Sequence, residues 1–82
     1  MDYSVRTLEQ LEPVLVAFRK KQGLTQAEMA QRTGVSQQAL SALESKPHRA
    51  SFERLLSYLS ALNVEIILRE KEPSVAHSSE EW

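Results

Sequence analysis

Residues 25–44 read TQAEMAQRTGVSQQALSALE, and this stretch decides the fold of the chain. Thr25 is followed three residues later by Glu28, which is the spacing of a capping box and predicts a helix directly after Thr25. Gly34 can adopt the positive φ that a tight turn between two helices requires. Ser36 can then cap a second helix. Two short helices joined in this way have the geometry that places the second helix in a DNA major groove.

The two faces of the second helix differ in chemistry. At 100° per residue, the apolar Leu40 and Leu43 lie on one face. The opposite face carries two amides, a hydroxyl and a small side chain, from Gln37, Gln38, Ser41 and Ala42. Glutamine can pair with the N6/N7 edge of adenine, and serine can donate to or accept from several bases. This face therefore predicts base recognition, and the alternative is an ordinary polar face on a helical hairpin.

Other polar side chains are placed where they could contact DNA phosphates. Gln26 lies in the first turn of the first helix, where its amide and the backbone N–H groups could hold a phosphate. Two cations lie in the loop SKPHRA at 45–50, and we expect them either to reach the DNA backbone or to stay in solvent. From the residues themselves, the predicted DNA-binding residues are Gln26, Gln37, Gln38, Ser41, Lys46 and Arg49.

Basic charge is concentrated around this motif. The whole chain of 82 residues has a net charge of −1 at pH 7. Residues 17–54 contain seven Lys or Arg and three Glu, a local charge of +4, whereas residues 1–16 carry −2 and residues 55–82 carry −3. Such an asymmetry can supply a phosphate-attracting face on a slightly acidic protein. The charge pattern is therefore compatible with DNA binding.

Several other classes of protein are excluded by what the sequence lacks. It has no cysteine, no apolar run of 18 residues and no basic-then-apolar signal at its N-terminus, so we expect a cytoplasmic protein without disulfides or a membrane span. His48 and His77 have no carboxylates at metal-ligand spacing. With no glycine-rich phosphate loop and no Ser/His/acid arrangement either, we expect no catalytic residue, no metal and no cofactor.

A helix is predicted before the motif. It runs from about Leu11 to Gln22 after an irregular first turn. Thr7 and Gln10 have the spacing of a capping box, but Pro13 is expected to interrupt a helix that begins there.

Another helix is predicted after the motif, over residues 52–62, with a buried apolar stripe of Phe52, Leu55, Leu56, Leu59 and Leu62. In the helix predicted at 11–22, Arg19 and Lys20 lie away from the apolar stripe of Leu11, Val14, Leu15 and Phe18. The basic run at 19–21 is expected either in solvent at the end of that helix or on a phosphate. Glu44 is expected to form hydrogen bonds at the end of its helix or within the structure.

Residues 64–69, VEIILR, have a different pattern. Their β-branched content predicts a short strand, and the helical remainder of the chain offers no strand to pair with it. Pairing with the same strand of a second copy would give an isologous dimer, and a fifth helix is the alternative. The predicted dimer contacts are Val64, Ile66, Ile67 and Leu68.

The end of the chain, residues 71–82, is polar and without period, so we expect a disordered tail after a single domain at 1–70. Trp82 is either a docking anchor for a partner or a chance terminus. The predicted fold is all-α, with four helices and one short C-terminal β-strand that pairs across a homodimer.

Three blocks of the sequence carry a family resemblance: LTQAEMA at 24–30, GVS at 34–36 and LSALE at 40–44. Together they resemble the Xre/Cro-type helix-turn-helix of phage and bacterial repressors. The whole-chain layout, with its short acidic tail ending in Trp82, further resembles the HipB-type antitoxins of HipBA toxin–antitoxin modules.

This resemblance implies a homodimer whose C-terminal strands pair into a small sheet. It implies that the dimer binds palindromic operator DNA, represses its own operon and binds a HipA-like serine/threonine kinase toxin. By position in the motif, the resemblance further implies that Ser36 is a DNA-binding residue that reads bases together with Gln37, Gln38 and Ser41, and that Gln26 holds a phosphate. Two alternatives remain: a stand-alone phage-type or metabolic repressor without a toxin partner, and a protein-interaction module that has the fold without the DNA activity.

Overall fold

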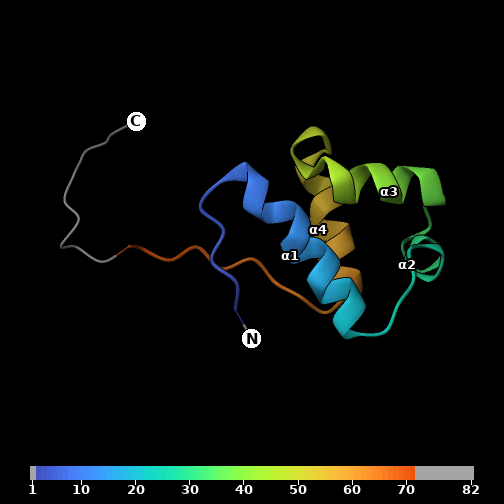
Figure 1. The fold of residues 1–82 in the computed structure, drawn as a ribbon, viewed down its shortest axis with the longest axis horizontal. Helices are drawn as coiled ribbons and strands as arrows, with labels where there is room; N and C mark the ends of the chain where they lie inside the picture. Colours follow the sequence, from blue (N-terminus) through green and yellow to red (C-terminus); the bar gives the residue numbers. More distant parts are fainter. Residues whose placement is uncertain (1, 72–82) are drawn as a thin grey trace.

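The computed structural model describes residues 2–71 of the chain. The predicted tail and Trp82 therefore lie outside the described residues, apart from Lys71. The described part contains four α-helices and a short 3₁₀ turn (Figure 1): α1 (Leu8–Lys21), α2 (Gln26–Thr33), α3 (Gln37–Ser45), η1 (Pro47–Arg49) and α4 (Phe52–Ala61). The all-α prediction with four helices is confirmed over this range. None of these helices is both long and apolar enough to cross a membrane.

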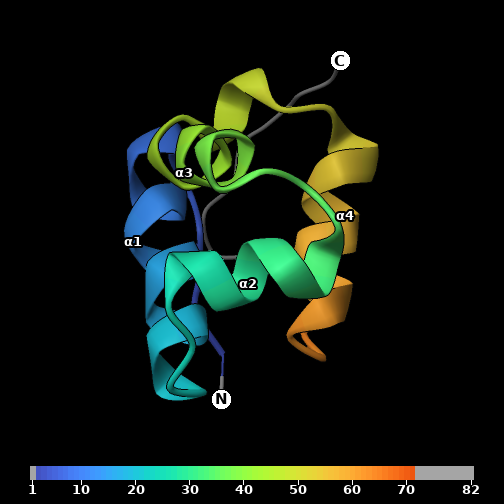
Figure 2. The ribbon, with the colours of Figure 1, turned by 90° about the vertical axis from the view of Figure 1, so that its right-hand side faces the viewer.

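Helices α2 and α3 lie together at one end of the molecule, and α1 and α4 flank them (Figure 2). The N-terminal segment and residues 64–71 lie at the other end (Figure 1). All four helices contribute to one apolar core, whose buried members are Leu15, Met29, Ala30, Leu40, Leu43, Tyr58, Leu59 and Leu62. The core thus holds the two motif helices against a two-helix support.

The helix boundaries of the motif follow from its capping residues. Thr25 Oγ1 accepts the backbone N–H of Glu28 at 3.1 Å, and the Glu28 carboxylate accepts the N–H of Thr25 at 2.8 Å. Gly34 ends α2 in the left-handed conformation, with φ of 77°. Ser36 Oγ then accepts the N–H of Ala39 at 3.0 Å and begins α3. The helix-turn-helix prediction is confirmed at each of these positions.

The predicted start of α1 at about Leu11 was wrong. The helix begins at Leu8, and Pro13 lies inside it. The capping box holds the first turn, because the Gln10 side chain accepts the N–H of Arg6 at 2.6 Å and of Thr7 at 3.3 Å. Pro13 is exposed and removes only one intrahelical hydrogen bond, so the capped turn and the helix continue through it.

The predicted stripe of α4 was also wrong in part. Phe52 and Leu56 are exposed, at 64% and 42%, whereas Tyr58 is buried. The buried face is rotated towards Leu55, Tyr58, Leu59 and Leu62, which share the i, i+3, i+4, i+7 spacing. Tyr58 can be buried because its hydroxyl donates a hydrogen bond to the carboxylate of Glu44, and the backbone carbonyl oxygen of Leu15 lies 3.3 Å from the same hydroxyl.

Residues 64–71 form neither a helix nor a strand in this single chain, and residues 2–71 contain no strand at all. The fifth-helix alternative is therefore wrong. The segment runs away from α4 as an extended ribbon (Figure 1). A strand that pairs only with a second copy cannot form within one chain, so the pairing itself stays a prediction.

Candidate nucleic-acid interface

One face of α3 is exposed to solvent. Gln37, Gln38 and Ser41 are all exposed on it, and Ser36 is exposed at its N-terminal end. The opposite face is anchored by Leu40 and Leu43, whose side chains are 2% and 4% exposed. All four predicted base-contacting residues are thus exposed on α3 or at its N-terminal end. Their contact with bases stays a prediction.

Gln26 lies at the start of α2 and is only partly buried, and its side-chain amide forms a hydrogen bond with another helix. Its Nε2 atom donates a hydrogen bond to Oε1 of Glu44, on α3, at 2.9 Å. A carboxamide nitrogen carries two hydrogens, so the second remains able to donate to a phosphate. Glu44 therefore orients the side chain that was predicted to hold phosphate, a link that the sequence interpretation missed.

Glu44 itself is buried, at 2% exposure, and forms an ion pair with Arg19 of α1. Arg19 Nε and Nη2 donate to its two carboxylate oxygens at 2.7 and 3.2 Å, while Nη1 donates to the carbonyl of Leu24 at 2.8 Å. The expectation that Arg19 would lie in solvent or on a phosphate was wrong. Its guanidinium joins α1 to α3, and the structural hydrogen-bonding role expected for Glu44 is confirmed.

The ionisation of this cluster follows from its hydrogen bonds. Burial of the Glu44 carboxyl disfavours its charged form, but hydrogen bonds from Arg19, Tyr58 and Gln26 outweigh burial and lower its pKa. The hydrogen bond to Glu44 raises the pKa of Arg19 despite burial. Burial, followed by the bond to Glu44, raises the pKa of the Tyr58 hydroxyl. At neutral pH the cluster therefore holds one carboxylate and one guanidinium.

A sequence signal for this cluster was available. Glu44 follows Leu40 by four residues, so it falls on the buried side of α3, where an unpaired carboxylate would be costly. That position demands a buried partner. Arg19 is 25 residues away along the chain, so periodicity alone could not identify it as that partner.

The cations around the motif remain at the surface. Arg19 and Glu44 remove one charge of each sign from the solvent-facing part of residues 17–54. The exposed charges that remain in this range sum to +4, from six cations and two Glu: Lys20, Lys21, Arg32, Lys46, Arg49, Arg54, Glu28 and Glu53. Lys46 follows α3 directly and Arg49 ends η1, and both are exposed. That these cations attract phosphate groups stays a prediction.

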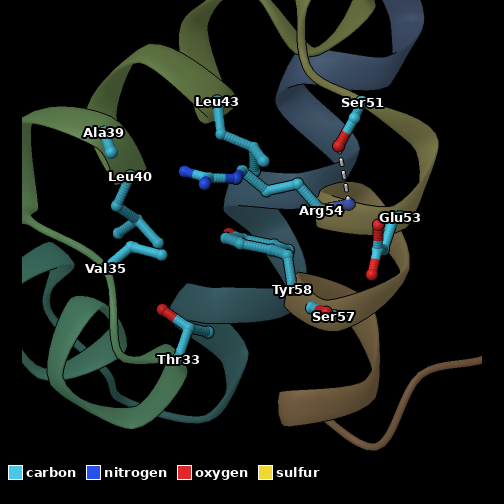
Figure 3. Close-up of a pocket in the computed structure, with 10 residues that line it drawn as sticks. All are labelled: Thr33, Val35, Ala39, Leu40, Leu43, Ser51, Glu53, Arg54, Ser57 and Tyr58. Atoms are coloured by element: carbon cyan, nitrogen blue, oxygen red, sulfur yellow. Dashed lines mark hydrogen bonds between the residues drawn. The ribbon is translucent and has the colours of Figure 1, made fainter.

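A hollow of about 320 Å³ lies behind α3, between the turn that precedes it and α4 (Figure 3). Val35, Leu40 and Leu43 give it an apolar side, and the Arg54 side chain reaches from α4 towards α3. None of the predicted DNA-binding residues lines it. The hollow therefore belongs to the packing side of α3, and the exposed polar face is the candidate interface.

Comparison with known families confirms the type of domain. Residues 15–68 match the family model HTH_3, described as helix-turn-helix. The chain belongs to this helix-turn-helix family. It is therefore a non-enzymatic DNA-binding transcriptional regulator, and the predicted Xre/Cro-type motif is confirmed. A comparison with curated proteins finds none that matches the sequence.

Solved structures share the fold. A HipB–O1–O2 complex aligns with a TM-score of 0.76 at 23% identity, over 84% of this chain and 100% of the HipB chain. A HipA–HipB–O2–O3 complex aligns with a TM-score of 0.77 at 22% identity, over 87% and 100%. An XRE family transcriptional regulator aligns with a TM-score of 0.64 at 32% identity, over 87% of this chain and 82% of that one.

Proposed function

We propose that this regulator is the antitoxin of a HipBA-type module: a homodimer that represses its own operon in the cytoplasm and binds a HipA-like kinase toxin. The observation that carries the DNA-binding part is the polar face of α3, where Gln37, Gln38 and Ser41 are exposed on a helix fixed by its cap and two buried leucines. This face offers hydrogen-bonding groups without charge or bulk, which suits base edges in a major groove.

In the proposed mechanism, α3 enters the major groove and the base-contacting groups are Ser36, Gln37, Gln38 and Ser41. Gln26, oriented by Glu44, donates its second amide hydrogen to a phosphate beside the groove. Lys46 and Arg49 contact the backbone beyond the end of α3. Phosphate contacts fix the position of the domain, and the side chains on α3 supply sequence preference.

The homodimer is proposed from the extended segment that follows α4. Val64, Ile66, Ile67 and Leu68 supply its contacts, and the last three are largely exposed in the single chain. A two-fold dimer would place its two α3 helices in successive major grooves of a palindromic operator, with half-sites about 34–36 Å apart or a multiple of that. The bound dimer would then block the promoter and prevent transcription.

The toxin partner is proposed from fold similarity to HipB, which occurs with HipA in one of the solved complexes. The test is co-expression of the chain with a HipA-like kinase encoded beside it, followed by size-exclusion chromatography. Co-elution is expected. In this proposal Trp82 is the candidate anchor for the kinase, so Trp82→Ala is expected to weaken co-elution without changing DNA binding.

The first experiment measures binding to the DNA directly upstream of the gene by fluorescence anisotropy, over a series of salt concentrations. We expect tighter binding to that fragment than to scrambled DNA, and a steep loss of affinity with added salt because phosphate contacts release counterions. Weak binding that is equal for both DNAs would contradict the repressor proposal.

A stand-alone repressor is the second candidate, favoured by the XRE family regulator, which is the more similar in sequence of the structures described above. It predicts the same DNA binding without a kinase partner. Preference for an operator elsewhere in the genome, together with no co-elution of any kinase encoded nearby, would select it over the antitoxin.

A further inference from the structure

We propose that the hollow behind α3 binds a small organic anion, namely an apolar body that carries one carboxylate. The apolar body fills the hollow, and the carboxylate pairs with the guanidinium of Arg54 on α4. All residues that line the hollow belong to one chain, so this site needs neither the proposed dimer nor the proposed kinase partner.

The hollow has the size and the lining of a site for a small molecule. Its volume of about 320 Å³ lies at the lower end of the range of ligand pockets, which is about 300–1,000 Å³. Its apolar lining comes from Val35, Leu40, Leu43 and Tyr58 (Figure 3). The Tyr58 hydroxyl is bonded to Glu44, so Tyr58 presents its ring to the hollow. This lining favours a ligand with an apolar body.

Arg54 supplies the positive charge of the site. Its side chain extends from α4 across the hollow towards α3 (Figure 3). Within residues 2–71, its guanidinium has no hydrogen bond and no ion pair. Glu53 also lines the hollow, but its side chain is directed away from that of Arg54 (Figure 3). The guanidinium is therefore available to a ligand.

The position of Arg54 within α4 argues against a purely structural role. Ser51 Oγ caps α4 by accepting the N–H of Arg54 at 3.0 Å, so Arg54 is the third residue of the helix. Glutamate or glutamine at that position would complete a capping box, as Glu28 does with Thr25. The helix dipole also disfavours a cation in the first turn and favours an anion. Arg54 thus departs from the local preference where a ligand would use its charge.

A carboxylate is the anionic group that suits these donors. The planar guanidinium of Arg54 can bind both oxygens of one carboxylate. Ser57, one turn further along α4, lines the same hollow and offers a hydroxyl as a second polar group. An aromatic or aliphatic carboxylate therefore fits both the apolar lining and the cation, whereas an inorganic anion fits only the cation.

A ligand in the hollow contacts the elements that position α3. Leu40 and Leu43 belong to the buried face of α3, and Val35 belongs to the turn that precedes it. The bound carboxylate also neutralises one exposed cation of residues 17–54. The ligand is therefore expected to lower the affinity for operator DNA, and this regulatory part rests on the proposed DNA binding.

A nuclear magnetic resonance titration of the isotope-labelled full chain tests the site, with benzoate as the probe. We expect saturable shifts of the backbone amides around the hollow, those of Val35, Ala39, Leu43 and Arg54. Benzamide has the ring without the charge, and inorganic phosphate has the charge without the ring. Each should therefore bind about tenfold more weakly than benzoate, or less tightly still.

Arg54→Gln removes the cation without weakening the helix. The glutamine can complete the capping box with Ser51, so the variant should be no less stable than the parent. Its affinity for benzoate should fall about tenfold or more, because the hydrogen bonds to a charged group are lost. Arg32→Gln is the matched control, since it removes an exposed cation of α2 outside the hollow and should bind benzoate as the parent does.

Fluorescence anisotropy with the upstream DNA measures the regulatory part. Saturating benzoate should weaken binding by the parent about fivefold, at the low end of the usual coupling between two sites. The same concentration of benzoate should leave DNA binding by Arg54→Gln unchanged, because that variant does not hold the ligand.

The outcomes separate the ligand site from the DNA-binding proposal. Shifts confined to the hollow, with tighter binding of benzoate than of the other two probes and weaker binding by Arg54→Gln, support the site. The site is overturned if no shift saturates, if benzamide or phosphate binds as well as benzoate, or if Arg54→Gln binds benzoate like the parent. Bound benzoate that leaves the affinity for DNA unchanged overturns the regulatory part alone. A parent that binds no DNA overturns the proposed repressor, while the titration without DNA still decides the site.

Discussion

At the scale of single residues, Glu44 links the helices of the fold through side-chain hydrogen bonds. Its carboxylate lies on α3 and accepts hydrogen bonds from Arg19 on α1, Gln26 on α2 and Tyr58 on α4. One buried acid therefore contacts all three other helices of the fold. The same carboxylate accepts a hydrogen bond from Gln26 of the candidate interface. The stability of the fold and the orientation of Gln26 therefore both depend on Glu44.

Glu44→Gln removes the charge and leaves the buried Arg19 guanidinium without a counter-ion. Breaking a buried pair in this way costs about 3–5 kcal/mol, which is a large share of the stability of so small a domain. Urea denaturation should show a loss of this size. Glu12→Gln, at an exposed position of α1, is the matched control and should change stability little. Equal stability of the two variants would contradict the role given to the ion pair.

The same group predicts a pH dependence. Its folded-state pKa lies below the ordinary value of 4.5, so the stabilisation is fully present above pH 4.5. It is lost as the pH falls through the lower folded-state pKa, because the unfolded chain binds the proton first. Thermal unfolding between pH 6 and pH 2 should show this loss in the parent, and a smaller loss in Glu44→Gln. A parallel decline in both proteins would assign the acid sensitivity to other carboxylates.

Gln37 tests the base-contacting face of α3. Gln37→Ala is expected to lose about 1–3 kcal/mol of discrimination between operator and scrambled DNA. The reason is that the substitution removes a side chain that can form two hydrogen bonds with one base edge. Anisotropy with both DNAs measures the difference. Ser60→Ala, at an exposed position of α4, is the control. Unchanged discrimination in Gln37→Ala would show that this residue does not read a base.

At the scale of elements, local signals predicted the motif and tertiary packing decided the rest. Thr25, Gly34 and Ser36 act within a few residues of themselves, so their positions in the sequence were sufficient to place α2 and α3. The buried face of α4 depends on Tyr58, whose hydroxyl needs Glu44 of another helix. The spacing of apolar residues alone cannot predict that Tyr58 is buried, because its burial depends on a hydrogen-bond partner in another helix.

The start of α1 was also predicted wrongly from the sequence, which placed it too late in the chain. Pro13 suggested an interrupted helix, yet the first turn is held by the Gln10 side chain and the helix continues. Pro13→Ala restores an N–H that can donate to the carbonyl of Glu9 and should stabilise the protein by up to about 3 kcal/mol. Urea denaturation measures the gain, with Glu12→Ala as the control. A loss of stability in Pro13→Ala would mean that the fixed φ of proline supports the helix.

At the scale of the whole molecule, the two proposed interfaces lie at opposite ends. The motif is at one end, and the extended segment 64–71 is at the other (Figure 1). Dimerisation through that segment would therefore leave both α3 faces open to DNA. The distance between them would be fixed by the dimer, so the spacing of the half-sites becomes a property of the protein.

This geometry predicts a sensitivity to the phase of the DNA helix. Inserting 5 base pairs between the half-sites turns one of them by about half a helical turn, so a two-fold dimer can engage only one at a time. Affinity in anisotropy should fall to that of a DNA with a single half-site. The same 5 base pairs inserted outside both half-sites are the control and should have no effect. Full affinity for the internally lengthened operator would show that two separate domains bind independently and would contradict a rigid dimer.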